Sequence, residues 1–246
     1  MKLTIITVVK NDKTNLLISL KSIMSQTYKD FEYIIYDGMS NDGTKEVVQK
    51  YSNKNLKYIC KKDNNYYEGL NYAITKATGD YIGILNAGDQ YFNCNTLKKI
   101  EKIIFLGNYD ILFGNLIYIN SRDHHVRHWN FPVKKLTLLS ALKIASPTLF
   151  IRKKIAKINL YNSRFSISSD TDFNLRLSQK KINFLYYDHY LILMRTGGLS
   201  TNYKFFFRKM SEDLIILRKY FKYTYTLIYL YKILIKIKTF FKFPGK

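Results

Sequence analysis

The first 85 residues alternate between strand-like and helix-like segments, and this alternation restricts the fold more than any other feature of the chain. Short β-branched and aromatic runs predict strands at residues 3–9, 31–36, 56–60 and 81–85. Between them, apolar side chains recur at helical spacing, most clearly over residues 12–26. Strands that alternate with helices in this way predict an α/β fold, with a Rossmann-like, mostly parallel sheet flanked by helices.

Polar side chains follow the expected strands at the edge where a parallel sheet binds its ligands. Asp37 follows the second strand, Asp63 the third, and Asn86 and Asp89 the fourth. Converging acids need cationic compensation, and the oxygens of Asn86 and Asp89 suit a hard divalent cation. The same residue types also form plain turns, so both interpretations of this last segment remain open.

Two further candidates lie in the less regular second half, where strands are expected at residues 109–113 and 115–120 and a helix at 172–180. Asp170 and Asp172 are two positions apart at the start of that helix. One side chain can therefore cap the helix while the other points into a cleft. A partly buried carboxylate there suits a general base, and a simple N-cap is the alternative.

Arg195 precedes a pair of glycines in the segment 194–200. The glycines allow close backbone approach, and the guanidinium offers a fork for phosphate oxygens. This combination predicts a contact to a phosphorylated ligand. A hairpin or lid that binds nothing is the alternative.

The end of the chain is strongly basic. The whole chain carries 40 Lys and Arg against 18 Asp and Glu, a formal charge of +22, and no acidic residue follows Asp213. Residues 203–246 are expected to form amphipathic helices with a basic arc opposite apolar and aromatic side chains. The basic arc holds Arg218, Lys219, Lys222, Lys232 and Lys236. This pattern predicts an interfacial helix on an anionic membrane surface, and a helix packed on the domain is the alternative.

The apolar run at residues 3–9 ends at Lys10 without a cleavage-site pattern, and lysines interrupt the apolar stretches near the C-terminus. We therefore expect a cytoplasmic protein, peripheral on the inner face of the cell membrane. A basic tail with interleaved aromatic residues also suits nucleic acid. The acids at the expected sheet edge argue against that partner, so no nucleic acid is expected.

Six sequence blocks, taken in order, resemble those of the family 2 glycosyltransferases. They lie at residues 4–11, 22–44, 77–89, 146–152, 167–176 and 194–200. The first two are similar to the family's opening, and the third, which ends in Asn-Ala-Gly-Asp, resembles its metal-binding strand end. The last three resemble its acceptor-side blocks. The resemblance covers about residues 1–202.

This resemblance implies a GT-A fold at residues 1–202, with a nucleotide-sugar-binding half at 1–115, an acceptor half at 116–202 and a basic amphipathic helical tail at 203–246. It also implies an inverting transfer of a sugar from a nucleoside diphosphate, with Mg²⁺ or Mn²⁺ as cofactor. The expected donor is a UDP-hexose. The expected acceptor is a saccharide on a polyprenyl diphosphate, as in the synthesis of O-antigen or other bacterial surface polysaccharide.

By the same resemblance, Asp37 and Asp63 contact the uracil or ribose, and Arg195 remains the candidate phosphate contact. Asp170 stands where the family's catalytic base lies, with its neighbour Asp172 as the second candidate. The acid deprotonates the acceptor hydroxyl, and direct displacement from an α-linked donor gives a β-glycoside.

Asp89 stands at the family's metal-binding position, assisted by Asn86. The chain departs from the family here, because Asn86 and Gly88 occupy the two acid positions of the usual Asp-X-Asp motif. Metal affinity is therefore expected to be weaker, or to depend more on the diphosphate. The departure also keeps open a scaffold that binds a nucleotide sugar without turnover, and a basic nucleic-acid-binding protein is the remaining alternative.

Overall fold

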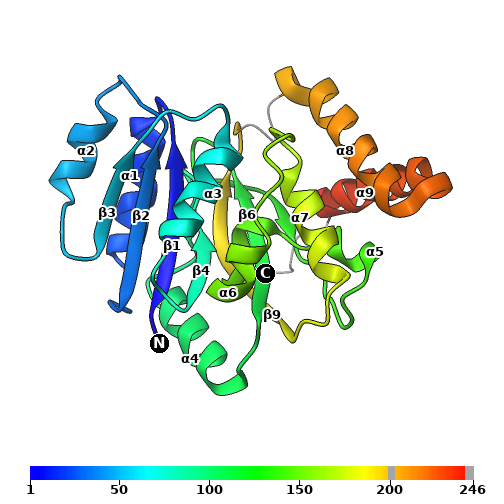
Figure 1. The fold of residues 1–246 in the computed structure, drawn as a ribbon, viewed down its shortest axis with the longest axis horizontal. Coiled ribbons are helices and arrows are strands. Elements are labelled where there is room, and N and C mark those ends of the chain that lie inside the picture. The colour runs from blue at the N-terminus through cyan, green and yellow to red at the C-terminus, as the bar shows by residue number, and fades with distance from the viewer. Residues whose placement is uncertain (199–202, 242–246) are drawn as a thin grey trace.

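The computed structural model describes residues 1–198 and 203–241 and shows an α/β chain built on one nine-stranded sheet (Figure 1). The strand order is β3–β2–β1–β4–β8–β6–β9–β5, and β7 pairs with β6 beside this path. The strands are β1 (Leu3–Val9), β2 (Phe31–Asp37), β3 (Leu56–Cys60), β4 (Tyr81–Ile84), β5 (Gln90–Tyr91), β6 (Ile111–Ile119), β7 (His125–Trp129), β8 (Phe150–Arg152) and β9 (Phe184–Arg195). The end of the 194–200 segment and the last residues of the tail lie outside the described residues.

The first four strands of the sheet, β1 to β4, are parallel, as the sequence predicts. β1 lies between β2 and β4, with Leu3 opposite both Phe31 and Tyr81, and β2 pairs with β3 so that Asp37 lies opposite Cys60. Their carboxyl ends therefore form one edge of the sheet. Beyond β4 the sheet becomes mixed, because β8 is antiparallel to both β4 and β6, whereas β6 and β9 are parallel.

Helices cover both faces of the sheet (Figure 1). They are α1 (Lys13–Met24), α2 (Thr44–Lys50), α3 (Tyr66–Lys76), α4 (Thr96–Gly107), α5 (Leu138–Ala141), α6 (Lys153–Ile158), α7 (Ser169–Ser178), α8 (Phe206–Phe221) and α9 (Tyr225–Phe241), with 3-10 turns η1 (Ser146–Thr148), η2 (Tyr203–Phe205) and η3 (Lys222–Thr224). Successive side chains of β1 enter different cores. Ile5 packs in the core that includes α1 and α4, and Ile6 in the core that includes α3 and α7.

Strand β6 is continuous where the sequence suggested two strands separated at residue 114. A Cβ atom on Gly114 would come within 2.8 Å of the Tyr187 carbonyl oxygen and 2.9 Å of the His189 carbonyl oxygen. Glycine thus marks a close approach of β9 within a strand and not a break between two strands. The register of β6 against β9 shifts at this same place.

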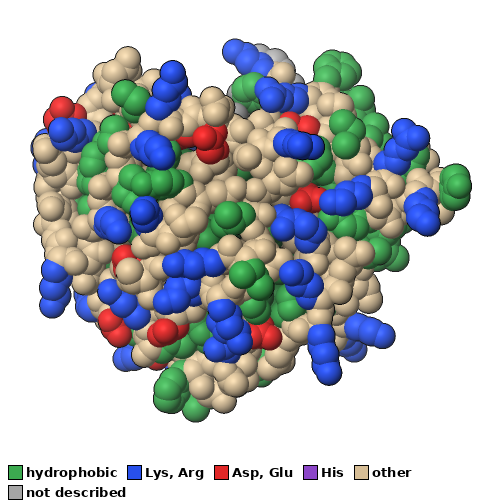
Figure 2. Space-filling view, viewed as in Figure 1, with side chains coloured by type: hydrophobic (Ala, Val, Ile, Leu, Met, Phe, Trp, Pro, Cys, Tyr) green, Lys and Arg blue, Asp and Glu red, His purple; other side chains and the backbone are tan. Residues whose placement is uncertain are grey.

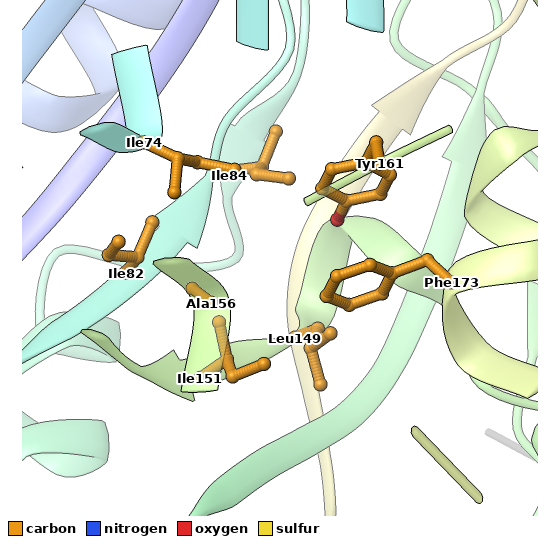
Figure 3. A pocket seen from close by; sticks show the side chains of 8 residues that line it. All are labelled: Ile74, Ile82, Ile84, Leu149, Ile151, Ala156, Tyr161 and Phe173. Carbon is orange, nitrogen blue, oxygen red and sulfur yellow. The ribbon is translucent and has the colours of Figure 1, made fainter. Parts of the chain in front are cut away.

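A small apolar gap lies in the core, and Figure 3 shows the side chains that surround it. They are Ile74, Ile82, Ile84, Leu149, Ile151, Ala156, Tyr161 and Phe173. The rings of Tyr161 and Phe173 stack with their centroids 4.2 Å apart. A lining of hydrocarbon cannot satisfy a charged nucleotide, so this gap belongs to core packing.

The C-terminal tail folds as a helical hairpin of α8 and α9 and not as one helix. α8 ends where Lys222 adopts a φ of 42°, in the left-handed region. α9 then runs back toward the sheet (Figure 1), where the Arg127 guanidinium of β7 lies 5.1 Å from the centre of the Phe240 ring. Ile235 of α9 joins the core that contains β1. The tail is therefore packed on the domain over much of its length.

The basic arc expected along one tail helix is wrong for α9. Lys232 is 7% exposed, and its Nζ lies 2.8 Å from Asp213 Oδ1. Arg218, Lys219 and Lys222 are exposed, as expected. The outward side of α9 instead carries apolar side chains that are 46–65% exposed, namely Leu227, Leu230, Leu234 and Ile237. No helix in the described part of the chain has the length and hydropathy needed to cross a bilayer.

Candidate active site

Asp37 lies at the carboxyl end of β2 and is 1% exposed. Its Oδ1 accepts hydrogen bonds from the backbone N–H and the hydroxyl of Ser40, at 2.8 and 2.6 Å. Its Oδ2 accepts one from the Tyr58 hydroxyl. These bonds fix the loop after β2 and hold the carboxylate at the predicted edge of the sheet.

Asp63 lies beside that loop, because two glycines leave room for its carboxylate. A Cβ atom on Gly38 would come within 2.8 Å of Asp63 Oδ2, and one on Gly69 within 3.2 Å. Burial raises the pKa of Asp63, Lys10 opposes the rise, and nearby acids that include Asp37 add to it. The structure thus brings together the two acids for which the sequence predicts a nucleoside contact.

Asp89 is 2% exposed and joins three parts of the fold. Its Oδ1 accepts from the backbone N–H of Arg195 at the end of β9, at 3.1 Å, and its Oδ2 accepts from Asn86 Nδ2 at 3.0 Å. Asn86 Oδ1 in turn accepts from the Tyr66 hydroxyl at the start of α3, at 2.6 Å. Burial raises the pKa of Asp89 to about 7, although the Asn86 and Arg195 hydrogen bonds lower it.

Of the residues joined around Asp89, only Asp89 itself offers a carboxylate to a divalent cation. In the described residues no three His, Cys, Asp or Glu side chains gather closely enough to hold a metal ion. Asp89 is buried, it forms no ion pair among the described residues, and its two hydrogen bonds come from an amide and a backbone N–H, so a bound cation would supply the missing positive charge. The residues therefore fit a cation that takes most of its oxygen ligands from a bound diphosphate and from water.

The guanidinium of Arg195 is bound by other residues of the protein. Its Nη2 lies 2.5 Å from Asp123 Oδ1, and its Nη1 donates to the Asn120 carbonyl oxygen at 3.0 Å. Both partners lie in the turn between β6 and β7. The backbone of Arg195 contacts Asp89, whereas a phosphate contact from its guanidinium would compete with this ion pair.

The structure separates the two acids at the start of α7, which begins three residues earlier than expected and places both in its first turn. Asp172 is 1% exposed, with Arg176 Nε at 2.8 Å, the Tyr220 hydroxyl at 2.9 Å and Lys219 Nζ at 3.6 Å. Asp172 therefore fastens α7 to α8. Asp170 is only partly buried, and the bond its carboxylate makes to a described residue is the 2.8 Å one from the Thr171 N–H.

Two tyrosines at the start of α3 connect Asp89 to Asp170. Asn86, which contacts Asp89, accepts a hydrogen bond from the Tyr66 hydroxyl at 2.6 Å, and the rings of Tyr66 and Tyr67 meet edge to face with their centroids 5.1 Å apart. The Tyr67 hydroxyl accepts from the backbone N–H of Asp170 at 3.4 Å. The acid at the end of β4 and the acid of α7 are thus joined by a short series of contacts. Figure 2 shows a notch in the upper edge of the molecule, between the side over β1–β3 and the side over α8.

Sequence reasoning missed a residue that holds the loop before α7. Glu212 of α8 accepts hydrogen bonds from the backbone N–H groups of Ser166, Ile167 and Ser168 and from the Ser166 hydroxyl, at 2.9–3.0 Å. Burial raises the pKa of Glu212, but the N–H groups of Ser168, Ile167 and Ser166 lower it more, so the carboxyl titrates below its usual range. A signal was present, because Glu212 and Asp213 are the last acids before the acid-free end.

An α/β sheet with Asp37, Asp63 and Asp89 at the carboxyl edge of its parallel strands has the arrangement in which α/β enzymes bind their ligands. Residues 4–157 match the model of Glycosyl transferase family 2, and the chain belongs to that family. The expected fold and enzyme class are thereby confirmed.

Two relatives show the range of similarity. The PGL/p-HBAD biosynthesis glycosyltransferase of Mycobacterium bovis is 28% identical over 190 residues, which cover 74% of this chain and 72% of the relative. Escherichia coli WfaP, a UDP-Glc:alpha-D-GlcNAc-diphosphoundecaprenol beta-1,3-glucosyltransferase, is 33% identical over 124 residues, 49% of this chain and 47% of the relative.

Solved structures share the fold at lower identity. S. aureus TarS 1-349 in complex with UDP-GlcNAc matches with a TM-score of 0.72 at 20% identity, over 98% of this chain and 72% of that one. The mannosyltransferase PcManGT from Pyrobaculum calidifontis, in complex with GDP-Man and Mn²⁺, matches with a TM-score of 0.69 at 13% identity, over 94% and 69%. At these identities the likeness concerns the fold.

Proposed function

We propose that this glycosyltransferase moves a hexose, with inversion, from a UDP-sugar to a saccharide carried on a polyprenyl diphosphate, in the synthesis of O-antigen or another bacterial surface polysaccharide. The observation that carries the proposal is the series of contacts that joins Asp89, at the carboxyl edge of the sheet, to Asp170 of α7 through Asn86, Tyr66 and Tyr67. The name of WfaP, with a UDP-sugar donor and a diphosphoundecaprenol-linked acceptor, supports this choice of substrates. The UDP-GlcNAc complex of TarS supports a uridine nucleotide.

The donor occupies the carboxyl edge of the parallel strands. Asp37 and Asp63 contact the uracil or ribose, where carboxylate oxygens accept hydrogen bonds from base N–H or sugar hydroxyl groups. The buried carboxylate of Asp89, with Asn86 beside it, would hold Mn²⁺ or Mg²⁺ together with the diphosphate, and a bound cation would supply charge stabilisation for the departing UDP. The Mn²⁺ complex of PcManGT supports a metal in this fold.

Asp170 is the general base. Its carboxylate is partly exposed and makes a single hydrogen bond to a described residue, so it is available to take the proton of an acceptor hydroxyl. Asp172 is unsuited to this role, because Arg176, Tyr220 and Lys219 already surround its oxygens. The deprotonated hydroxyl attacks the anomeric carbon opposite the leaving diphosphate, which turns an α-linked donor into a β-glycoside.

The tail brings the enzyme to the inner face of the membrane. Its exposed cations Arg218 and Lys222 attract anionic headgroups, and the apolar outward side of α9 enters the headgroup boundary. A tail that is both packed and interfacial keeps α8 and α9 next to Asp170 and α7. Such a position suits an acceptor anchored in lipid.

The test is a transfer assay with purified protein, Mn²⁺, a panel of UDP-hexoses and UDP-N-acetylhexosamines, and GlcNAc diphosphate bearing a short alkyl chain. We expect one donor to give a disaccharide diphosphate by mass spectrometry, with release of UDP that stops in EDTA. Tight UDP-sugar binding without transfer to this or any other diphosphate-linked sugar would support the non-catalytic scaffold. Salt-sensitive RNA or DNA binding in place of donor binding would support the nucleic-acid alternative.

A further inference from the structure

Three lysines of the C-terminal hairpin gather at the N-terminal end of α7, next to the proposed base. This lysine cluster consists of Lys209 of α8 together with Lys232 and Lys236, which lie one turn apart on the same side of α9. Lys232 Nζ donates to Thr171 Oγ1 and to Asp213 Oδ1, both at 2.8 Å, and Lys209 Nζ lies 3.4 Å from Ser168 Oγ. α8 and α9 therefore direct cations at the residues on either side of Asp170.

One of the three lysines is paired with a carboxylate in the described part of the chain. Asp213 neutralises Lys232, and in the described chain neither Lys209 nor Lys236 forms an ion pair. The pKa of Lys236 is lowered to about 7, first by burial and then by the charges of Lys232 and Lys209, against the opposing charges of Asp213 and Asp170. Clustered cations with spare N–H donors cost free energy unless an anion lies among them.

The orientation of α9 is the reverse of that of an ordinary surface helix. An ordinary surface helix turns its lysines to water and its leucines to the core. α9 instead turns Lys232 inward, 7% exposed, while leucines occupy the outward side, with Leu230 and Leu234 more than half exposed. A helix oriented in this way presents its lysines to a ligand bound beside α7. It presents its leucines to the surroundings of the protein.

We propose that the lysine cluster is a subsite for the diphosphate of the acceptor, with Lys209 and Lys236 as the residues that contact the phosphate oxygens. The inference rests on the proposed lipid-linked acceptor and adds the residues that recognise its charged part. One sugar ring separates the attacked hydroxyl from the diphosphate in a monosaccharide acceptor, so a phosphate subsite must adjoin the base. The cluster meets that condition, because it contacts Ser168 and Thr171.

The experiment is a binding titration that requires no turnover. Octyl diphosphate is titrated by calorimetry into full-length protein saturated with UDP, so that the donor's phosphate site is already filled. We expect measurable binding to the unchanged protein. Lys209→Gln and Lys236→Gln should each weaken it by at least about tenfold, since each removes a charge-assisted hydrogen-bond donor.

Matched controls keep the outcome interpretable. Lys238→Gln makes the same charge change at an exposed position of α9, so it should leave the affinity unchanged, and Lys236→Arg should retain most of it. Sedimentation with phosphatidylglycerol vesicles should be the same for Lys236→Gln and Lys238→Gln, and a selective loss of vesicle binding by Lys236→Gln would identify a lipid headgroup site instead. Equal octyl diphosphate affinity in all variants would overturn the subsite and leave the transferase proposal standing, whereas retained diphosphate binding with no sugar transfer would do the reverse.

Discussion

The proposed donor edge, at the carboxyl ends of β2 to β4, and the proposed acceptor side, at Asp170 and the loop before α7, both present carboxylates. The fold holds the two regions in different ways. Asp37 at the donor edge takes its hydrogen bonds from Ser40 and Tyr58, which are 3 and 21 positions away. The loop before α7 is held by Glu212 across 44 to 46 positions. The part of the donor edge around Asp37 is thus built by strand ends and the turns that follow them, whereas Asp89 also accepts a hydrogen bond from Arg195, 106 positions along the chain. The acceptor side is complete only when the C-terminal hairpin has folded onto it.

The largest effect should come from the acid that faces the acceptor. Asp170→Asn removes the base while keeping size and shape, so turnover should fall by about 10²–10⁴-fold. Donor affinity, measured by UDP-sugar calorimetry, should remain close to that of the unchanged protein. Asp172→Asn is the matched comparison, and it should lower the melting temperature because it breaks the contacts of α7 with α8. Should Asp172→Asn abolish transfer while Asp170→Asn spares it, the roles are exchanged.

The corresponding change at the donor edge should have a smaller effect. Asp89→Ala should lower kcat/KM by about 10–100-fold, a range typical of losing support at a metal site. The variant should also need a higher Mn²⁺ concentration for half-maximal rate, because Asp89 is the one carboxylate that we propose binds the metal. Full turnover of the variant at limiting Mn²⁺ would contradict the metal assignment.

A tail residue should affect catalysis from outside the site. Glu212→Gln replaces a carboxylate that accepts four hydrogen bonds from the loop before α7. We expect kcat to fall by roughly tenfold through misplacement of Asp170, with little change in donor KM. Arg208→Gln, which removes only the exposed partner 3.4 Å from Glu212, is the control and should behave like the unchanged protein. A Glu212 variant with unchanged kcat would show that the acceptor side does not depend on the hairpin.

Changes to exposed cations of the hairpin should weaken membrane binding and leave catalysis unchanged. Changing Arg218 and Lys222 to Glu removes attraction worth about 1 kcal/mol per cation at an anionic surface, so vesicle binding should weaken by at least about tenfold. Lys219 is left unchanged, because its Nζ lies 3.6 Å from Asp172. Turnover of a water-soluble acceptor should survive in the double variant. Equal binding of the unchanged protein to neutral and anionic vesicles would contradict the interfacial assignment.

The smallest effect concerns stability at low pH. The pKa of Glu212 is depressed in the folded protein, so its contribution to stability is present above its usual value of 4.5 and is lost as the pH falls through the lower folded value. The unchanged protein should therefore melt a few degrees above Glu212→Gln at pH 7, and the gap should shrink at pH 3. Thermal melts monitored by circular dichroism at the two pH values measure this, and a gap that widens at pH 3 would give the opposite sign.

The same contrast explains what could be predicted from the sequence. The parallel strands and the placement of Asp37, Asp63 and Asp89 at one edge follow from short-range patterns, because a strand end positions whatever follows it. The resemblance favours Asp170 over Asp172 as the base, but the contacts that distinguish the two acids could not be predicted, since one of them comes from Tyr220, 48 positions along the chain.

The tail shows why a helical wheel is insufficient. The wheel treats residues 217–236 as one helix, but α8 ends at Lys222, a residue that gives no helix-stop signal of the kind that Gly or Pro would give. Beyond that point the wheel placed Lys232 on the exposed side, whereas the fold buries it against Asp213. The contact joins residues 19 positions apart on two different helices, and no local pattern encodes it.

The most direct test of the account is the configuration of the glycosidic bond made by the unchanged enzyme. A single displacement assisted by one base, Asp170, predicts that an α-linked UDP-hexose gives only a β-glycoside, whose anomeric proton can be assigned by NMR on the purified disaccharide diphosphate. A pure β product that disappears with Asp170→Asn is the predicted result. An α-linked product would require retention of configuration and would contradict the proposed mechanism.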